Sequence, residues 1–357
     1  MQKIIPERLQ KGDKIMVIAP ARGVKIIGKD VREIARERLE SLGLEVVFAP
    51  NAVDENWDYM GSSSVEKRIS DIHTAFADKS VKGVMTIIGG ANSNQLLPHL
   101  DYELIRQNPK IFCGFSDITA LENAILAKTG LVTYYGPHFS SLGMKKGCDY
   151  TFEHFVKMLV TDGRDEVEPS QIWSDDLWFL DQDKREFEAN EGYWKIRAGF
   201  AEGTIIGGNL GTFNLLLGTS YRPRFAADTI LFVEDTESSP LADFERNLQA
   251  LIYQDDFKNV KGLVIGRFQK GSQVTREGLE FILNTKPELK DMPILANVDF
   301  GHSAPLLTIP KTGDNSPLGL LLAIAGISLA GLAVLVHKSA RRKELAPRTD
   351  EDNDTEE

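Results

Sequence analysis

Residues 110–128, KIFCGFSDITALENAILAK, predict a strand that passes almost directly into a helix. The apolar run Lys110–Gly114 has the length of a buried strand, and Ile118–Lys128 has the apolar content of a helix. Ser116 stands in the short turn between them. A strand joined to a helix in this way is the basic unit of a parallel α/β sheet.

The same alternation extends to both sides of this unit. Further strands are expected at Lys14–Ala19, Glu45–Ala49, Gly83–Ile88 and Leu131–Tyr135. Helices are expected from a cap at Asp30 to Leu42, from a capping box at Ser63 and Glu66 to Phe76, and over Ser93–Leu100. Strict alternation predicts a parallel sheet with helices on both faces.

A second α/β pattern follows a stretch without periodicity. Residues 166–197 are rich in acids and in tryptophan and show no clear period, which is typical of a connecting loop. Strands are then expected at Thr229–Val233, Gly262–Ile265 and Pro293–Val298, and helices at Leu241–Tyr253 and Arg276–Leu283. We therefore expect an N-terminal α/β domain (1–165), a connecting and specificity loop (166–200), a smaller C-terminal α/β domain (201–312) and a tail (313–357).

Composition excludes several functional classes. The 357 residues carry a net charge of −11, so that nucleic acid is a poor candidate partner. The two cysteines, Cys113 and Cys148, are too few for a disulfide framework or a cysteine-rich metal site, and a buried inert thiol is the favoured interpretation of Cys113. No metal and no cofactor are predicted.

The C-terminal tail contains an uncharged apolar stretch, Leu318–Val336. As a helix these residues would be about 28 Å long, close to the thickness of a bilayer core, and they predict a transmembrane helix over 318–336. The basic residues Lys338, Arg341, Arg342 and Lys343 that follow would lie in the cytoplasm. The alternative is a buried core helix.

Residues 309–314, IPKTGD, precede this apolar stretch. The pentapeptide IPKTG (309–313), the apolar stretch and the basic cluster together resemble the sorting signal of Gram-positive surface proteins. A sortase is therefore a candidate partner. Surface display requires export, yet the first eight residues, MQKIIPER, lack the apolar core of a secretory signal. Three interpretations stay open: an incomplete start, a borrowed tail, or a tail-anchored protein with its catalytic domain in the cytoplasm.

A serine, a group of carboxylates and a histidine, the residue types suited to acyl transfer, stand where predicted strands end. Ser116 lies at a helix N-terminus, which favours a developing oxyanion. Three carboxylates, those of Glu234, Asp235 and Glu237, follow one later strand, and any of them could orient a histidine, while His302 follows another strand. Ligands of open parallel sheets bind at the carboxyl ends of strands, so the three are expected to meet. Their chain order, Ser, Glu, His, is that of the α/β-hydrolases. Taken singly, each has a plainer interpretation as a helix cap, a solvated turn or an incidental loop histidine.

A glycine pair, Gly89-Gly90, also follows a predicted strand. A glycine backbone allows close approach, and its N–H could stabilise an oxyanion. A phosphate-binding loop is the alternative, although the third glycine of a dinucleotide fingerprint is absent.

These residues resemble the LD-carboxypeptidase family of serine peptidases, and most of all its microcin C self-immunity branch. The matching stretches are 87–97 (IIGGANSNQLL), 114–121 (GFSDITAL), 207–210 (GGNL), 233–235 (VED) and 301–302 (GH). The resemblance implies Ser116 as nucleophile, His302 as general base and Glu234 as the orienting acid. It also implies an oxyanion hole formed by the backbone N–H groups of Gly90 and Asp117.

The resemblance also implies the class of substrate. The immunity branch hydrolyses the amide between a peptide's terminal aspartate and a nucleotide-like group, whereas other members release terminal D-alanine from murein peptides. Asn92 and Ser93 are closer to the immunity branch, and Trp173 or Trp178 could stack on a nucleobase. We expect a peptidyl-nucleotide hydrolase, with a murein LD-carboxypeptidase and an inactive surface-displayed binding protein as alternatives. The sequence allows a homodimer.

Overall fold

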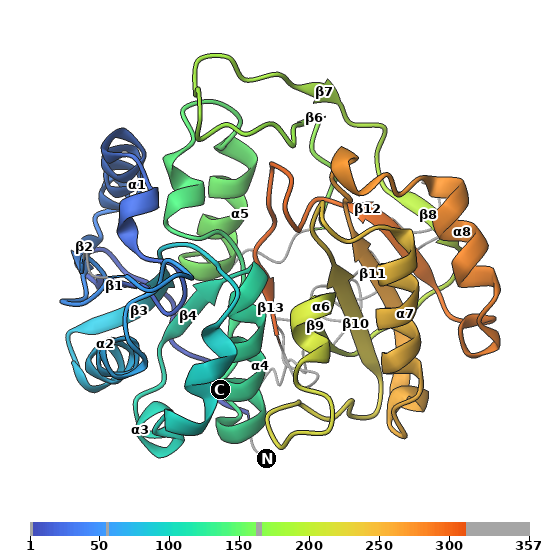
Figure 1. The fold of residues 1–357 in the computed structure, drawn as a ribbon, viewed down its shortest axis with the longest axis horizontal. Helices are drawn as coiled ribbons and strands as arrows, with labels where there is room; N and C mark the ends of the chain where they lie inside the picture. Colours follow the sequence, from blue (N-terminus) through green and yellow to red (C-terminus); the bar gives the residue numbers. More distant parts are fainter. Residues whose placement is uncertain (1–2, 55–56, 162–165, 312–357) are drawn as a thin grey trace, which may run out of the picture. The chain divides into compact units, whose positions relative to one another are not determined.

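The first half of the chain, together with one strand from near residue 310, forms a six-stranded sheet (Figure 1). The structure, a computed structural model, describes residues 3–54, 57–161 and 166–311, which lie within one compact unit. The strands follow the order β13–β5–β4–β3–β1–β2, and only β13 runs antiparallel to its neighbour. Their bounds are β1 Lys14–Ile18, β2 Glu45–Phe48, β3 Val81–Thr86, β4 Ile111–Gly114, β5 Tyr134–Tyr135 and β13 Ile309–Pro310.

Helices cover both faces of this sheet, as the strand–helix alternation predicts. Figure 1 shows α1 and α5 on one side of the strands and α2, α3 and α4 on the other. The sheet and these helices enclose one apolar core, which leaves the strand ends as the places where polar side chains can gather. The helices are α1 Lys29–Ser41, α2 Val65–Ala77, α3 Tyr102–Gln107, α4 Thr119–Thr129 and α5 Asp149–Leu159.

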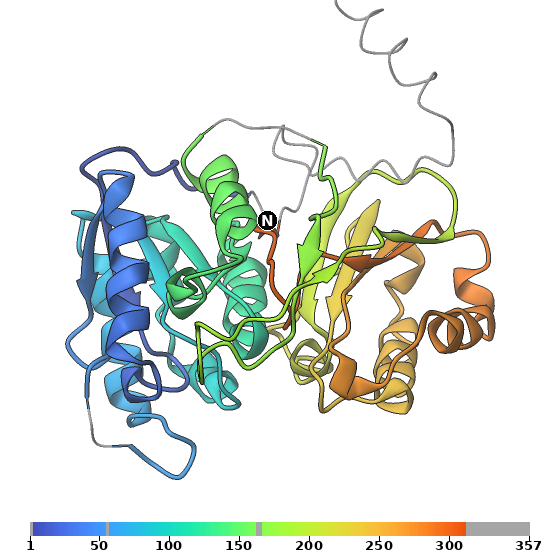
Figure 2. The ribbon, with the colours of Figure 1, turned by 90° about the horizontal axis from the view of Figure 1, so that it is seen from above.

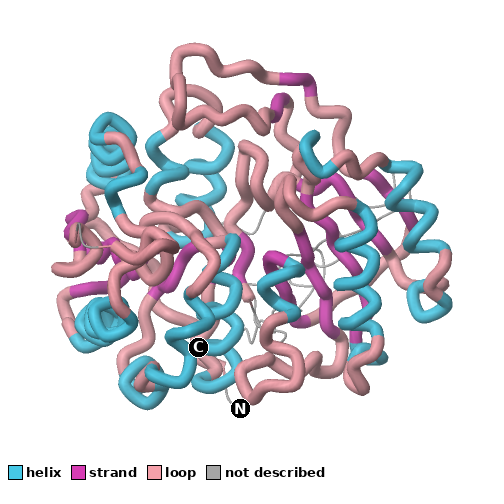
Figure 3. Tube along the Cα trace, in the orientation of Figure 1, coloured by secondary structure: helices cyan, strands magenta, loops and turns pink. Residues whose placement is uncertain are grey.

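The second half forms a five-stranded sheet of order β8–β12–β11–β10–β9, in which only β8 is antiparallel. The strands of both sheets are magenta in Figure 3. Its strands are β8 Trp194–Arg197, β9 Thr204–Asn209, β10 Thr229–Glu234, β11 Val260–Gly266 and β12 Ile294–Val298, and its helices are α6 Leu210–Asn214, α7 Leu241–Ile252 and α8 Arg276–Asn284. Short 3₁₀ helices complete the fold: η1 Val24–Ile26, η2 Ser93–His99, η3 Ser116–Ile118, η4 Ser140–Gly143, η5 Phe257–Asn259, η6 Lys270–Ser272 and η7 Pro287–Leu289.

Strand β10 shows how the second sheet is buried on both faces. Leu231 and Val233 belong to the apolar core shared with α6, α7 and α8, whereas Ile230 and Phe232 belong to a separate core that also contains Tyr135 of the first sheet. Successive strand residues point to opposite faces, so Glu234 at the end of β10 points to the same side as Phe232. Its carboxylate is thereby directed toward the first sheet.

The chain returns to the first sheet after completing the second. Following β12, residues 299–308 lead to β13, whose Ile309 pairs with Tyr135 of β5. Figure 2 shows this returning segment between the two sheets. The segment 166–193 links the halves as well, through the two-stranded pair β6 (Ile172–Trp173) and β7 (Glu188–Ala189). Its Ser174 also pairs with Ala304 in an isolated antiparallel bridge.

The predicted transmembrane helix requires correction. None of the helices in the described ranges is long and apolar enough to cross a membrane. The longest of them, α1 and α2, have 13 residues each, against about 20 needed for a bilayer, and both have a polar face. Residues 318–336 lie outside the described residues. The fold class is therefore two-sheet α/β, without a supported membrane span.

The sorting-like stretch is also placed only in part. Ile309 and Pro310 form β13, and both they and Lys311 are buried. Thr312 and Gly313, between which a sortase would cut, lie outside the described residues.

Candidate active site

The structure brings the three predicted side chains together from both sheets. Ser116 begins η3 two residues after the end of β4, Glu234 ends β10, and His302 lies four residues after β12. Ser116 Oγ is 2.9 Å from His302 Nε2, and His302 Nδ1 is 2.7 Å from Glu234 Oε2. The nucleophile candidate therefore comes from one sheet, and the acid and base candidates come from the other.

The backbone at Ser116 is in the left-handed region, with φ of +61°. A non-glycine residue rarely adopts this conformation, and it is often found at functional sites. Here it lifts the hydroxyl out of the strand direction and toward His302. Ser116 stays partly exposed, so a substrate carbonyl can approach it.

Glu234 and His302 are closely packed by the surrounding chain. The Glu234 side chain is fully buried, whereas His302 is 19% exposed. Gly301, with φ of +114°, brings the chain against the carboxylate, and a Cβ atom there would lie 2.9 Å from Glu234 Oε2. Only glycine fits this close approach. The close approach of the chain to Glu234 therefore explains why glycine precedes His302.

The charge states of Glu234 and His302 depend on two opposing effects, their burial and their hydrogen bonds to polar neighbours. Burial by itself would raise the pKa of Glu234, but His302, Tyr135 and Asn209 outweigh it, and the pKa is lowered. Burial would lower the pKa of His302, but the Glu234 carboxylate outweighs it, and the pKa is raised above its usual 6.5. The carboxylate is thus ionised, and the imidazole becomes protonated as the pH falls through a value above 6.5. A neutral imidazole beside a serine hydroxyl can accept its proton.

Asp117 fixes the turn that carries Ser116. Its carboxylate accepts hydrogen bonds from the backbone N–H groups of Asn92 (3.1 Å) and Ser93 (2.9 Å), and the Ser93 hydroxyl donates to the Asp117 carbonyl (2.7 Å). The backbone N–H and the hydroxyl of Ser93 both hydrogen-bond to Asp117. Asn92 is buried, and its side-chain oxygen accepts from Ser62. Substrate contact by Asn92 and Ser93 stays a prediction.

The glycine pair lies beside the nucleophile candidate. A Cβ atom at Gly89 would be 3.2 Å from Ser116 Oγ, and one at Gly90 would be 2.8 Å from Ala21 Cβ. At Gly90 a side chain would collide with Ala21 in the loop after β1, and at Gly89 it would crowd the Ser116 side chain. The oxyanion role of the Gly90 and Asp117 N–H groups stays a prediction.

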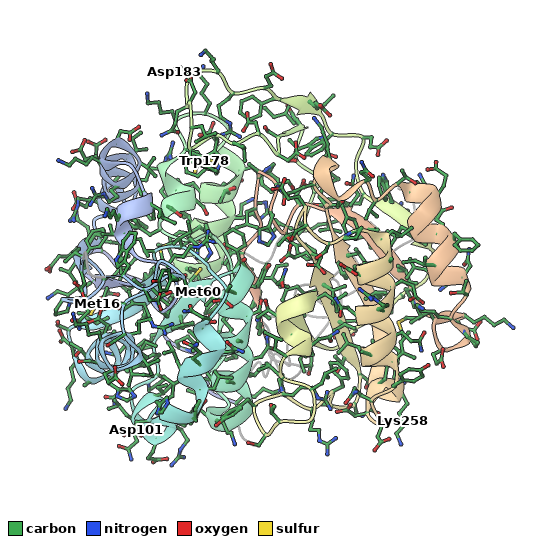
Figure 4. The ribbon with its side chains drawn as sticks, in the orientation of Figure 1. Met16, Met60, Asp101, Trp178, Asp183 and Lys258 are labelled. Carbon is green, nitrogen blue, oxygen red and sulfur yellow. The ribbon has the colours of Figure 1, made fainter. Side chains whose placement is uncertain are left out.

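The two tryptophans proposed for base stacking differ in their surroundings. The guanidinium of Arg267 lies over the Trp173 ring at 4.8 Å, and Arg267 itself forms a buried ion pair with Asp299. One face of Trp173 is thus covered, and the charge of Arg267 is already paired. Trp178, labelled in Figure 4, packs against the first core and is partly exposed.

Two residues of the site were not predicted from the sequence. Tyr135, at the end of β5, donates a hydrogen bond to Glu234 Oε1 at 2.5 Å, and Asn209, at the end of β9, donates to the same oxygen at 3.2 Å. Both stand at carboxyl ends of parallel strands, so the rule that located Ser116 and Glu234 could have found them. No three His, Cys, Asp or Glu side chains form a metal-binding group in the described ranges.

Comparison with known proteins points to one family. The model of the LD-carboxypeptidase N-terminal domain matches residues 15–136, and that of the LD-carboxypeptidase C-terminal domain matches residues 202–314. YocD of Bacillus subtilis, which carries a provisional carboxypeptidase name, is 49% identical over 86% of this chain and 93% of its own. The microcin C7 self-immunity protein MccF of Escherichia coli is 34% identical over 75% of this chain and 78% of its own.

Solved structures are similar over most of the chain. An MccF-like protein from Bacillus anthracis has a TM-score of 0.84 and 50% identity, covering 86% of this chain and 94% of that one. MccF in complex with aspartyl sulfamoyl adenosine has a TM-score of 0.76 and 30% identity, covering 87% and 94%.

Proposed function

Because this chain belongs to the LD-carboxypeptidase family, a family of serine carboxypeptidases, we propose that it hydrolyses the amide bond of peptidyl or aminoacyl nucleotides. The observation that carries this proposal is the hydrogen-bonded series Ser116–His302–Glu234. The complex of MccF with aspartyl sulfamoyl adenosine supports the substrate class. Such an activity would serve microcin C-like immunity or the detoxification of aminoacyl nucleotides.

The proposed reaction proceeds through an acyl-enzyme. Ser116 Oγ attacks the scissile carbonyl carbon while His302 Nε2 accepts the hydroxyl proton, and Glu234 stabilises the resulting imidazolium. The backbone N–H groups of Gly90 and Asp117 would stabilise the oxyanion. His302 then returns the proton to the leaving nitrogen, and water, activated by the same imidazole, releases the acyl group from Ser116.

Recognition of the nucleotide is proposed to fall to the connecting segment. Trp178 is the stronger candidate for stacking on the base, because one face of Trp173 already carries Arg267. Leu177 and Phe179 beside Trp178 are exposed, with 53% and 58% of their surface accessible, so this part of the segment is open to a ligand. The partly exposed ring of Trp178 is suited to stacking on adenine.

A comparison of two substrates tests the proposal. We expect the protein to split aspartyl sulfamoyl adenosine into aspartate and the free sulfamoyl nucleoside, with kcat/KM at least about tenfold above that for release of D-alanine from a murein tetrapeptide, because only the first offers a base to stack. Mass spectrometry of the products measures both rates. Faster release of D-alanine would favour the murein activity, and turnover of neither substrate would favour a binding protein.

A further inference from the structure

The hydroxyl of Tyr135 connects the two halves of the catalytic site. Tyr135 lies on β5 of the first sheet and is fully buried. Its phenol oxygen donates to Glu234 Oε1 at 2.5 Å and accepts from the backbone N–H of Ser116 at 3.5 Å. One atom thus contacts both the carboxylate from the second sheet and the main chain of the nucleophile candidate.

We infer that Tyr135 is a positioning residue, which holds Glu234 ionised and aligned behind His302 and keeps that pair in register with Ser116. This inference rests on the proposed function. A residue of the first sheet, Tyr135, would thus orient Glu234, which belongs to the second sheet. The remaining Glu234 oxygen, Oε2, is then left for His302 Nδ1.

The donors around Glu234 explain why one hydroxyl matters. The carboxylate is inaccessible to solvent, and its Oε1 receives hydrogen bonds only from Tyr135 and the more distant Asn209 among the described residues. A buried charge depends on such donors, because water cannot replace them. The shorter of the two bonds comes from Tyr135, and hydrogen bonds to an ionised group are the stronger kind.

The ring of Tyr135 is held in place independently of its hydroxyl. It packs edge-on against Phe232 with the centroids 5.3 Å apart, and against Phe115 at 6.1 Å. The ammonium of Lys311 lies 5.4 Å from the ring centroid. Burial, and then Glu234, raise the pKa of the phenol well above 10, so the hydroxyl keeps the proton that it donates. Removing only the oxygen leaves this packing in place.

The expected pH effect has a definite sign. Tyr135 stabilises the state in which Glu234 is charged and His302 is neutral, which is the state that can activate Ser116. Without the hydroxyl, the Glu234–His302 pair takes up a proton more readily, so the acidic limb of activity moves to higher pH. The other ionisable groups around the pair stay the same: Asp235 and Glu237 after β10, His138 after β5, and Lys311 with Glu122 behind the Tyr135 ring.

The test compares Tyr135→Phe with Tyr134→Phe. Tyr134 is the preceding residue of β5, is also buried, and packs in the first core on the opposite face, which makes it a matched control. The rate at which a fluorophosphonate labels Ser116 is measured across pH by mass spectrometry. For Tyr135→Phe we expect labelling about tenfold slower at neutral pH, with the acidic limb about half a unit to one unit higher. Tyr134→Phe should match the wild type.

Labelling requires no substrate, so failure of this inference can be distinguished from failure of the proposed function. If the wild type labels normally and the acidic limb of the pH profile of Tyr135→Phe is not shifted, the role of Tyr135 is overturned and the proposed function is not affected. An equal shift in Tyr134→Phe would also overturn it, because the effect would then be general loosening of β5. Absence of labelling in the wild type would overturn the catalytic assignment on which the inference rests.

Discussion

Replacing Ser116 by alanine is expected to lower kcat for aspartyl sulfamoyl adenosine by about 10⁴-fold or more, because no acyl-enzyme can form without Oγ. The KM should change little, since the hydroxyl hydrogen-bonds to His302 and substrate contacts come from other residues. Steady-state kinetics with product detection by mass spectrometry measures both constants. Ser41→Ala, which removes an exposed hydroxyl at the end of α1, serves as the control and should leave both unchanged.

A residual rate near that of the wild type in Ser116→Ala would contradict the serine mechanism. Water activated directly by His302 would then be the simplest alternative. An unchanged kcat with a raised KM would instead indicate that Ser116 binds the substrate without reacting. Either result would show that Ser116 occupies the predicted place in the fold without acting as the nucleophile.

The largest effect on stability is expected at a buried ion pair that joins α4 to the end of β13 in the first sheet. Lys311 Nζ lies 2.6 Å from Glu122 Oε2, and both side chains are inaccessible to solvent. Burial raises the pKa of Glu122 to about 7 and lowers the pKa of Lys311. The Lys311 ammonium also lies over the rings of Tyr135 and Phe232, within the core that joins the sheets.

Lys311→Met is therefore expected to lower the free energy of unfolding by about 3–5 kcal/mol at pH 8, since it leaves the Glu122 carboxylate buried without its cation. The loss should be smaller at pH 5. Without the cation the pKa of Glu122 rises further above its unfolded value, so the folded state binds a proton that the unfolded state lacks, and stability falls as the pH rises between the two values. Urea denaturation at both pH values measures the difference.

The double variant Glu122→Gln/Lys311→Met provides the control. It removes both charges, so most of the lost stability should return. If the double variant is as unstable as Lys311→Met, the loss comes from packing around Lys311 and not from the orphaned carboxylate. If the loss of unfolding free energy in Lys311→Met is the same at pH 5 and pH 8, the unpaired Glu122 carboxylate is likewise not its cause.

Local sequence patterns predict much of the first sheet and the position of the site. The strand at Lys110–Gly114 and the helix after it form where expected, and the rule that strand ends meet brings Ser116, Glu234 and His302 within reach of one another. That rule works because parallel strands end at a common edge, whatever their separation along the chain. The contacts of Tyr135 depend on how the two sheets pack, which no local pattern contains.

Other differences have local causes. Strand β9, TIIGGN, was not predicted, because two glycines weaken a strand pattern. Helix α5 was also missed, although Phe152, Phe155 and Leu159 have helical spacing and could have indicated it. The cap of α2 is Ser64 and not Ser63, since the Ser64 hydroxyl accepts from the Lys67 N–H, and two adjacent serines offer the sequence no means of choosing.

Covalent labelling by a fluorophosphonate tests most directly whether Ser116, His302 and Glu234 act as one unit. In the wild type we expect a single adduct, mapped by peptide mass spectrometry to Ser116, because a serine reacts only when an adjacent base activates it. Labelling of His302→Ala should be at least about 100-fold slower, as expected for loss of general-base assistance. An adduct on Ser116 that forms equally fast in His302→Ala, or no adduct on Ser116 in the wild type, would contradict a catalytic unit shared by the two sheets.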